Sequence, residues 1–293
     1  MAVSMRKQIA QNKRNTVLII GVFVAMLTLL GWLFALLGNN PIILIAFAVI
    51  SFGYALFQYF LADKVAISTA GAKQINRADN ERYYRAVERL AVEANIPLPK
   101  VYVINDDAPN AFATGRDPEH ASIAATTGLL EVMDDNELRA VIGHELSHIK
   151  NYDIRVSMIV FGLVSLTGLM SDFGLRVLFY GNRKEEEHSP IGTLFTLIVL
   201  ILSPIVATIV QMGISRQREY LADASSATLL GNADDMIAAL RKLDTHSRPM
   251  HSQNVAAEPM YIANPLHKSV LSRLFSTHPP IESRIERLEN AKK

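Results

Sequence analysis

The sequence predicts a mostly α-helical protein with a small β-sheet, an α+β fold, in which a polar domain is fused to about four transmembrane helices. Half of the 293 residues are hydrophobic and the mean hydropathy is positive, which is unusual for a soluble enzyme. No charged residue lies between Asn15 and Ala62 or between Ser189 and Ser215, and a helix crosses a bilayer with about 20 apolar residues. The predicted organisation is residues 1–61, with membrane helices 1 and 2; residues 62–155, the first part of a cytoplasmic domain; residues 156–214, with membrane helices 3 and 4; and residues 215–293, the second part of that domain.

The charge and cysteine content exclude several classes of function. The net charge is +1, whereas a nucleic-acid binder normally has a strongly basic surface. The chain contains no cysteine, so disulfides and thiolate metal ligands are excluded, and any metal must be held by histidine and carboxylate. A cysteine-free polar domain fits the cytoplasm.

Two apolar stretches near the N-terminus predict the first pair of membrane helices. Thr16 to Leu37 is too long and too rich in Leu and Ile for a signal peptide. Gly38 to Pro41 is a turn, and Ile42 to Leu61 is the second span. Basic residues precede the pair and none lies in its loop, which puts the N-terminus and the polar domain in the cytoplasm of a multi-pass cell-membrane protein. These basic residues are Arg6, Lys7, Lys13 and Arg14.

The segment that follows has the composition of a soluble protein. Asp79 to Ala94 shows amphipathic helix spacing, and Val101 to Ile104 is typical of a strand. Asn110 to Gly115 and Ser122 to Thr126 are two further short extended candidates. An extended peptide could add as another strand to the edge of such a sheet. The alternative is that these strands form only core.

A helix with a metal-binding motif follows these strands. Asp134 and Glu137 have the spacing of a capping box. His144 and His148, four residues apart, share one helical face, and Glu145 lies beside them. This pattern suits zinc with two imidazole ligands and a glutamate that takes a proton from an activated water. The alternative is a solvated helical face with two surface histidines.

The later apolar stretches predict the second pair of membrane helices. Met158 to Tyr180 contains Asp172 and Arg176 at i,i+4 spacing, so it is either a third span with a paired charge or a helix that only dips into the bilayer. Ile191 to Ile214 is an uninterrupted fourth span. Four crossings return the chain to the cytoplasm at Arg216, where helical patterns continue.

A catalytic zinc usually takes three protein ligands, so the two histidines are not sufficient. Ile154 excludes the form with a third histidine six residues after His148. Asp153 would face away from both histidines if the helix continued. Glu219 is the best candidate, with Asp223 one turn further on the same face and able to accept the outer N–H of a ligating histidine. An ordinary surface carboxylate pair is the alternative.

With these residues the chain resembles the HtpX group of integral-membrane zinc metalloproteases, which are related to the CAAX prenyl endopeptidases. The resemblance covers nearly the whole chain. The features that carry it are the sequence HELSH at His144 to His148, the Glu219 and Asp223 pair, Asn110 to Gly115, Ser276 to Pro280 with Arg284, and apolar helices on both sides of the histidine motif.

The resemblance implies a gluzincin-like protease domain with one zinc ion per chain. It implies the ligands His144, His148 and Glu219, the catalytic base Glu145, and a supporting role for Asp223. It also implies that the family's task is membrane-protein quality control, by cleavage of damaged or misfolded proteins. The implied substrate-binding edge strand begins with Asn110, Ala111, Phe112 and Ala113.

Three further residues have two interpretations each. Asn151 could brace the metal site by a hydrogen bond, or be an exposed residue at the helix C-terminus. His278 could donate to the oxyanion of the tetrahedral intermediate, or cap the closing helix that runs from Pro280 to Ala291. Arg284 either holds that closing helix in place by a salt bridge, which is what we expect, or touches substrate.

The predicted function is hydrolysis of peptide bonds in misfolded or damaged membrane proteins, with a zinc-activated water and Glu145 as general base. The expected partners are protein substrates and the lipid bilayer, and the oligomeric state is not predicted. One alternative is a protease that processes one defined precursor. The other is a membrane scaffold or transporter with a structural zinc site, which would need four protein ligands where only three are found.

Overall fold

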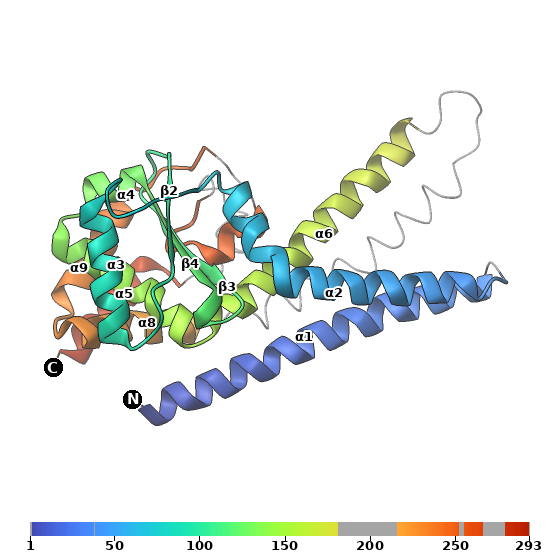
Figure 1. Cartoon of the computed structure of the whole chain (residues 1–293), viewed down its shortest axis with the longest axis horizontal. Helices are drawn as coiled ribbons and strands as arrows, with labels where there is room; N and C mark the ends of the chain where they lie inside the picture. The colour runs from blue at the N-terminus through green and yellow to red at the C-terminus, as the bar shows by residue number, and fades with distance from the viewer. Residues whose placement is uncertain (1, 38, 181–215, 252–254, 266–278, 293) are drawn as a thin grey trace.

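The computed structural model describes residues 2–37, 39–180, 216–251, 255–265 and 279–292. The fold is mostly helical with one small mixed sheet, as the sequence predicts. A rounded α/β part contains the sheet, and a group of long helices projects from it (Figure 1). The predicted fourth span, Ile191 to Ile214, and His278 lie outside the described residues.

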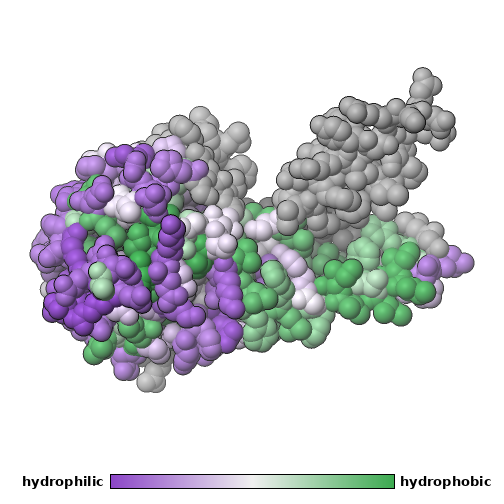
Figure 2. All heavy atoms as spheres, turned by 45° about the horizontal axis from the view of Figure 1, so that its top comes forward, coloured by the Kyte–Doolittle hydropathy of each residue, from purple (hydrophilic) through white to green (hydrophobic). Residues whose placement is uncertain are grey.

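Two of the projecting helices are α1, Ala2–Leu37, and α2, Ile42–Thr69, which pack against each other. Both are long and apolar enough to cross a membrane. Large apolar side chains such as Trp32 and Ile45 are exposed on them, and Figure 2 shows this part of the surface as hydrophobic. The second helix continues eight residues beyond the predicted span, which ended at Leu61.

A third long helix, α6 (Asp153–Tyr180), packs against α1 and α2. Its first half shares an apolar core with α1, built around Ile19, Phe23 and Ile159. The predicted helix from Met158 to Tyr180 lies within α6, so its helical conformation is confirmed. The side chains of Asp172 and Arg176 are outside the described part of the structure.

The sheet has four strands in the order β1-β2-β4-β3. Strands β2 and β4 are parallel, and the outer pairs β1–β2 and β4–β3 are antiparallel. The three predicted strands are confirmed within a residue of their ends, whereas β1, with only two residues, is too short to produce a pattern. The strands are β1 (Lys73–Gln74), β2 (Lys100–Ile104), β3 (Ala111–Gly115) and β4 (Ala121–Thr126).

Helices surround this sheet, and α5 lies at their centre. It contacts α3, α8, α9, α6 and β3, and Leu138, Leu146 and Ile149 on it are fully buried. Each such side chain contributes about 1.5–3 kcal/mol on burial, so the helix position is strongly determined. The α/β part also contains α3 (Glu81–Ala94), η1 (Pro118–His120), α4 (Thr127–Val132), α5 (Asp135–Lys150), α8 (Arg216–Leu230), α9 (Asp234–Thr245), η2 (Val255–Met260) and α11 (Ile281–Ala291).

Candidate active site

The start of α5 is fixed by the predicted capping box, which the structure confirms. The Asp134 carboxylate accepts from the backbone N–H groups of Asn136 and Glu137, both at 2.9 Å, and Glu137 Oε2 accepts from the Asp134 N–H at 2.8 Å. Lys242 of α9 donates to the same Glu137 oxygen at 2.6 Å. Helix α5 therefore begins at a defined residue, and this fixes the positions of His144 and His148 further along it.

Three potential metal-ligand atoms converge between α5 and α8. The Nε2 atoms of His144 and His148 are 3.1 Å apart. His144 Nε2 lies 3.6 Å from Oε2 of Glu219, and His148 Nε2 lies 3.6 Å from Oε1 of the same carboxylate. Zinc bound tetrahedrally at 2.0–2.1 Å places its ligand atoms about 3.3 Å from one another. Two imidazoles and a carboxylate at this spacing fit zinc. His144, His148 and Glu219 are the residues predicted from the sequence as zinc ligands, and that role stays a prediction.

The outer nitrogen of His144 contacts a buried carboxylate. His144 Nδ1 lies 2.9 Å from Asp223 Oδ1. Arg284 of α11 holds this carboxylate with two hydrogen bonds, Nε to Oδ2 at 2.8 Å and Nη2 to Oδ1 at 2.7 Å. Arg284 is 1% exposed, and the expected salt bridge that anchors the closing helix is present. The arrangement leaves Nε2 of His144 directed at the cluster.

The charged and hydrogen-bonding partners of these buried groups shift their pKa values against the effect of burial. Burial alone would lower the pKa of His144, but its hydrogen bonds with Asp223 and Glu219 raise it to about 9. Burial alone would raise the pKa of Asp223, but the charge and hydrogen bonds of Arg284 hold it below its usual range. Burial would lower the pKa of Arg284, and the charge of Asp223 instead raises it. Asp223 and Arg284 therefore form a charged pair behind the cluster of His144, His148 and Glu219.

Asp153 contacts the second histidine, contrary to the expectation that it faces away. Its Oδ2 lies 3.1 Å from His148 Nδ1. The expectation assumed a continuous helix, but α5 ends at Lys150 and Tyr152 has a positive φ of 60°, so the chain turns and α6 begins at Asp153. The sequence contains a local indication of this helix break. Asn151 is of a type that is frequent where helices end, and Asp153 is of a type that is frequent where they begin.

Glu145 is buried beside this cluster. It is 1% exposed. Burial and then the charge of Glu145 raise the pKa of Tyr83, and the same charge contributes to the raised pKa of Arg284. A carboxylate beside a possible metal site is compatible with general-base catalysis, and this role of Glu145 stays a prediction.

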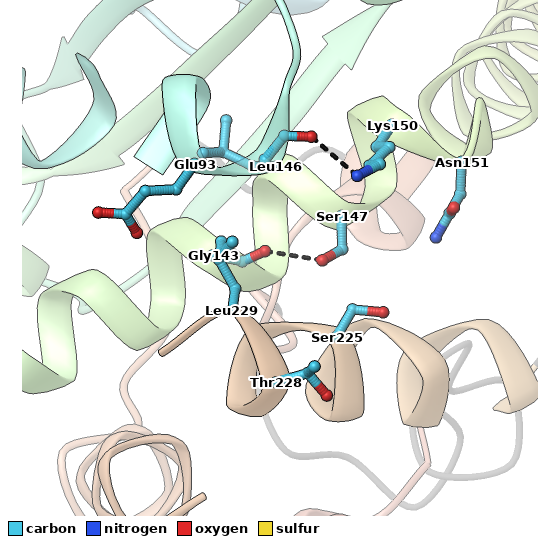
Figure 3. Close-up of a pocket in the computed structure, with 10 residues that line it drawn as sticks. Glu93, Gly143, Leu146, Ser147, Lys150, Asn151, Ser225, Thr228 and Leu229 are labelled. Carbon is cyan, nitrogen blue, oxygen red and sulfur yellow. Dashed lines mark hydrogen bonds between the residues drawn. The ribbon is translucent and has the colours of Figure 1, made fainter. Parts of the chain in front are cut away.

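Asn151, which was expected either to brace the metal site or to be exposed, is buried. Its backbone oxygen accepts a hydrogen bond from Asn12 at 2.9 Å, and its side-chain oxygen has no hydrogen-bond partner within the described part of the chain. Asn151 lines a cavity of about 470 Å³ with Ser147, Lys150 and Ser225, as Figure 3 shows. The bracing role of its side chain stays a prediction.

The edge strand named for substrate binding is already paired with another part of the chain. The Ala111 carbonyl accepts from the Ile262 N–H at 2.9 Å. The buried Asn110 side chain donates to the Ala263 carbonyl at 2.9 Å and accepts from its N–H at 3.2 Å, and the rings of Phe112 and Tyr261 are 5.0 Å apart. A substrate strand would have to displace this stretch or pair beyond it, at Ala113. The substrate-binding role of these residues stays a prediction.

Comparison with known proteins identifies the family of the chain. Residues 77–292 match the model of Peptidase family M48. The chain is 46% identical to "Protease HtpX homolog" of Tropheryma whipplei (strain Twist), over 96% of both chains, and 45% identical to "Protease HtpX homolog" of Streptococcus gordonii, over 96% of this chain and 98% of that one. The crystal structure of S. mikatae Ste24p has a similar fold, with a TM-score of 0.53 and 21% identity, and the match covers 92% of this chain and 62% of that one. The chain belongs to Peptidase family M48 and is an HtpX-type metalloprotease.

Proposed function

We propose that the protein is a membrane-embedded, zinc-dependent endopeptidase that hydrolyses peptide bonds of misfolded or damaged membrane proteins in quality control. The observation that carries the proposal is the convergence of His144, His148 and Glu219 at zinc spacing with the buried carboxylate of Glu145 beside them. Only three protein ligands have this spacing among the described residues, which leaves a coordination position for water or substrate, as in catalytic zinc sites.

The proposed roles of the residues follow from their contacts. His144, His148 and Glu219 would hold one zinc ion, and Asp223 would keep the His144 ring oriented. When zinc is bound, the Lewis acidity needed to activate water and to polarise the scissile carbonyl comes from the metal. Glu145 accepts a proton from the attacking water and passes it to the leaving amine nitrogen, so that peptide and water give a carboxylic acid and an amine.

The long apolar helices support the membrane part of the proposal. The exposed apolar side chains of α1 and α2 need a lipid or protein environment. The α/β part with the metal site directly follows α2 in the chain, so segments that emerge from the bilayer could reach the site. With the basic N-terminal residues inside, this site would face the cytoplasm.

The experiment that tests the proposal measures zinc content and cleavage of unfolded casein by the detergent-purified full chain. Wild type should bind about one zinc per chain and cleave casein. Glu145→Gln should bind the same amount of zinc and lose at least about 100-fold of the cleavage rate, because it removes the general base. Glu131→Gln, an exposed change on α4, is the matched control and should leave both unchanged.

Three outcomes would contradict the proposal or part of it. Near-wild-type cleavage by Glu145→Gln would exclude Glu145 as the base. Zinc binding without cleavage of casein or any membrane protein offered would favour a structural zinc site, and cleavage of a single defined precursor would favour a processing protease.

A further inference from the structure

A buried asparagine of α1 contacts the turn between α5 and α6. Asn12 is 3% exposed, and its Nδ2 donates to Asp153 Oδ1 at 2.6 Å and to the backbone oxygen of Asn151 at 2.9 Å. The neighbouring Lys13 lies over the Tyr152 ring, 4.4 Å from its centroid. The N-terminal part of α1 runs beside the α/β part before the helix continues along α2 (Figure 1). The contacts join the start of a membrane helix to residues about 140 positions later.

The carboxylate that Asn12 contacts is the one that contacts a metal ligand. Asp153 Oδ1 faces Asn12 and also lies 3.7 Å from Nη1 of Arg218, while Oδ2 lies 3.1 Å from His148 Nδ1. Arg218 is 8% exposed and directly precedes Glu219 on α8. Both Asp153 oxygens are therefore engaged, and its buried charge is compensated by a cation.

The two histidines are thus supported by different parts of the molecule. Asp223, which holds His144, is itself held by Arg284, and both come from the α/β part. Asp153, which contacts His148, is contacted by Arg218 of α8 and by Asn12, which lies in α1 just before the first predicted span. A carboxylate that accepts the outer N–H of a ligating histidine fixes the ring orientation only if the carboxylate itself is fixed.

We propose that Asn12 is a positioning residue of the metal centre, which fixes Asp153 so that His148 presents Nε2 to zinc. The N-terminal helix is then a component of the zinc site as well as a membrane anchor. The inference rests on the proposed zinc site. It differs from simple helix packing because it predicts a change in metal affinity and in coordination geometry, not only in stability.

The test uses the full chain in detergent, stripped of metal, with zinc affinity measured by competition with a chelator. Asn12→Ala should weaken zinc binding by about 10–100-fold, the usual effect of removing such a supporting contact. Cobalt substituted for zinc should show altered visible absorption bands, which report coordination geometry. Gln11→Ala, the adjacent exposed residue of α1, is the matched control and should match wild type in both measurements. The melting temperature of each metal-free variant reports folding.

Exchanging the side chains of positions 12 and 153 tests the direct contact between Asn12 and Asp153. Asn12→Asp faces Asp153 with a second carboxylate and should bind zinc more weakly than Asn12→Ala. Combining Asn12→Asp with Asp153→Asn restores an amide–carboxylate pair, in which the new asparagine can still accept from His148. The double variant should recover part of the affinity that Asn12→Asp loses. If Asn12→Ala does not fold, this recovery decides the question.

The outcomes separate this inference from the proposed function. If Asn12→Ala has the same zinc affinity and the same cobalt spectrum as wild type, the inference is overturned, and the proposed protease function is unaffected. A lower melting temperature with unchanged zinc affinity, or a double variant no better than Asn12→Asp, would reduce Asn12 to a packing contact. If wild type itself binds no zinc, the proposed function is wrong.

Discussion

At the scale of single residues, the two histidines of α5 differ in electrostatic environment. His144 is completely enclosed and lies between the charged groups of Asp223, Glu219 and Arg284. His148 is partly exposed and contacts Asp153. The neighbours of His144 raise its pKa to about 9, so this side chain carries a proton that it must lose when it binds a metal ion.

We expect zinc binding to release a proton from His144 at pH 7. Its pKa of about 9 lies above that pH, so the metal-free side chain is charged, whereas a ligating imidazole is neutral. The apparent zinc affinity should then increase as the pH rises towards 9 and change less above it. Calorimetric titrations in two buffers with different protonation enthalpies measure the release.

The control for this prediction is Asp223→Asn, which removes a carboxylate that raises the pKa of His144. Proton release should be smaller in this variant. A binding enthalpy in wild type that is independent of the buffer at pH 7 would show that the site is already deprotonated.

At the scale of elements, α5 carries both histidines and Glu145, the proposed general base, so its first turn controls their positions along the helix. Asp134→Ala removes one half of the capping box and should cost about 1 kcal/mol, which lowers the melting temperature by about 2–4 °C for a domain of this size. Asn136→Ala, an exposed change in the same turn, should have no such effect. Equal melting temperatures of the two variants would show that packing of Leu138 and Leu146, rather than the cap, determines where α5 begins.

At the scale of the whole molecule, the basic N-terminus and the uncharged turn between α1 and α2 predict opposite sides of the membrane. The chain contains no cysteine, so single cysteines can be introduced without background. Asn40→Cys in the turn should react with a membrane-impermeant maleimide added to intact cells, because that turn faces outward. Glu119→Cys in η1 should react only after permeabilisation. The reverse pattern would place the α/β part outside the cell and contradict the cytoplasmic assignment.

The sequence by itself determined the features that depend on neighbours a few residues apart. The four-residue spacing of His144 and His148 puts both rings on one face of any helix, and the capping box, the three longer strands and the long apolar helices arise from equally local patterns. The choice of Glu219 also came from the sequence, through its spacing from Asp223 and the number of ligands that zinc requires.

The tertiary structure alone decided the contacts made by Asp153, Asn12 and Ile262. Asp153 reaches His148 because Tyr152 turns the chain, and Asn12 reaches Asp153 across 141 positions. Ile262 pairs with the edge of β3 in the same way, from a distant segment. Such contacts have no sequence pattern, because they depend on how separate helices and strands pack, and packing is set by the whole buried core rather than by the residues in contact. The candidate ligands and Asp223 could therefore be predicted from the chain, whereas the contacts of Asp153 and Asn12 became apparent only in the folded structure.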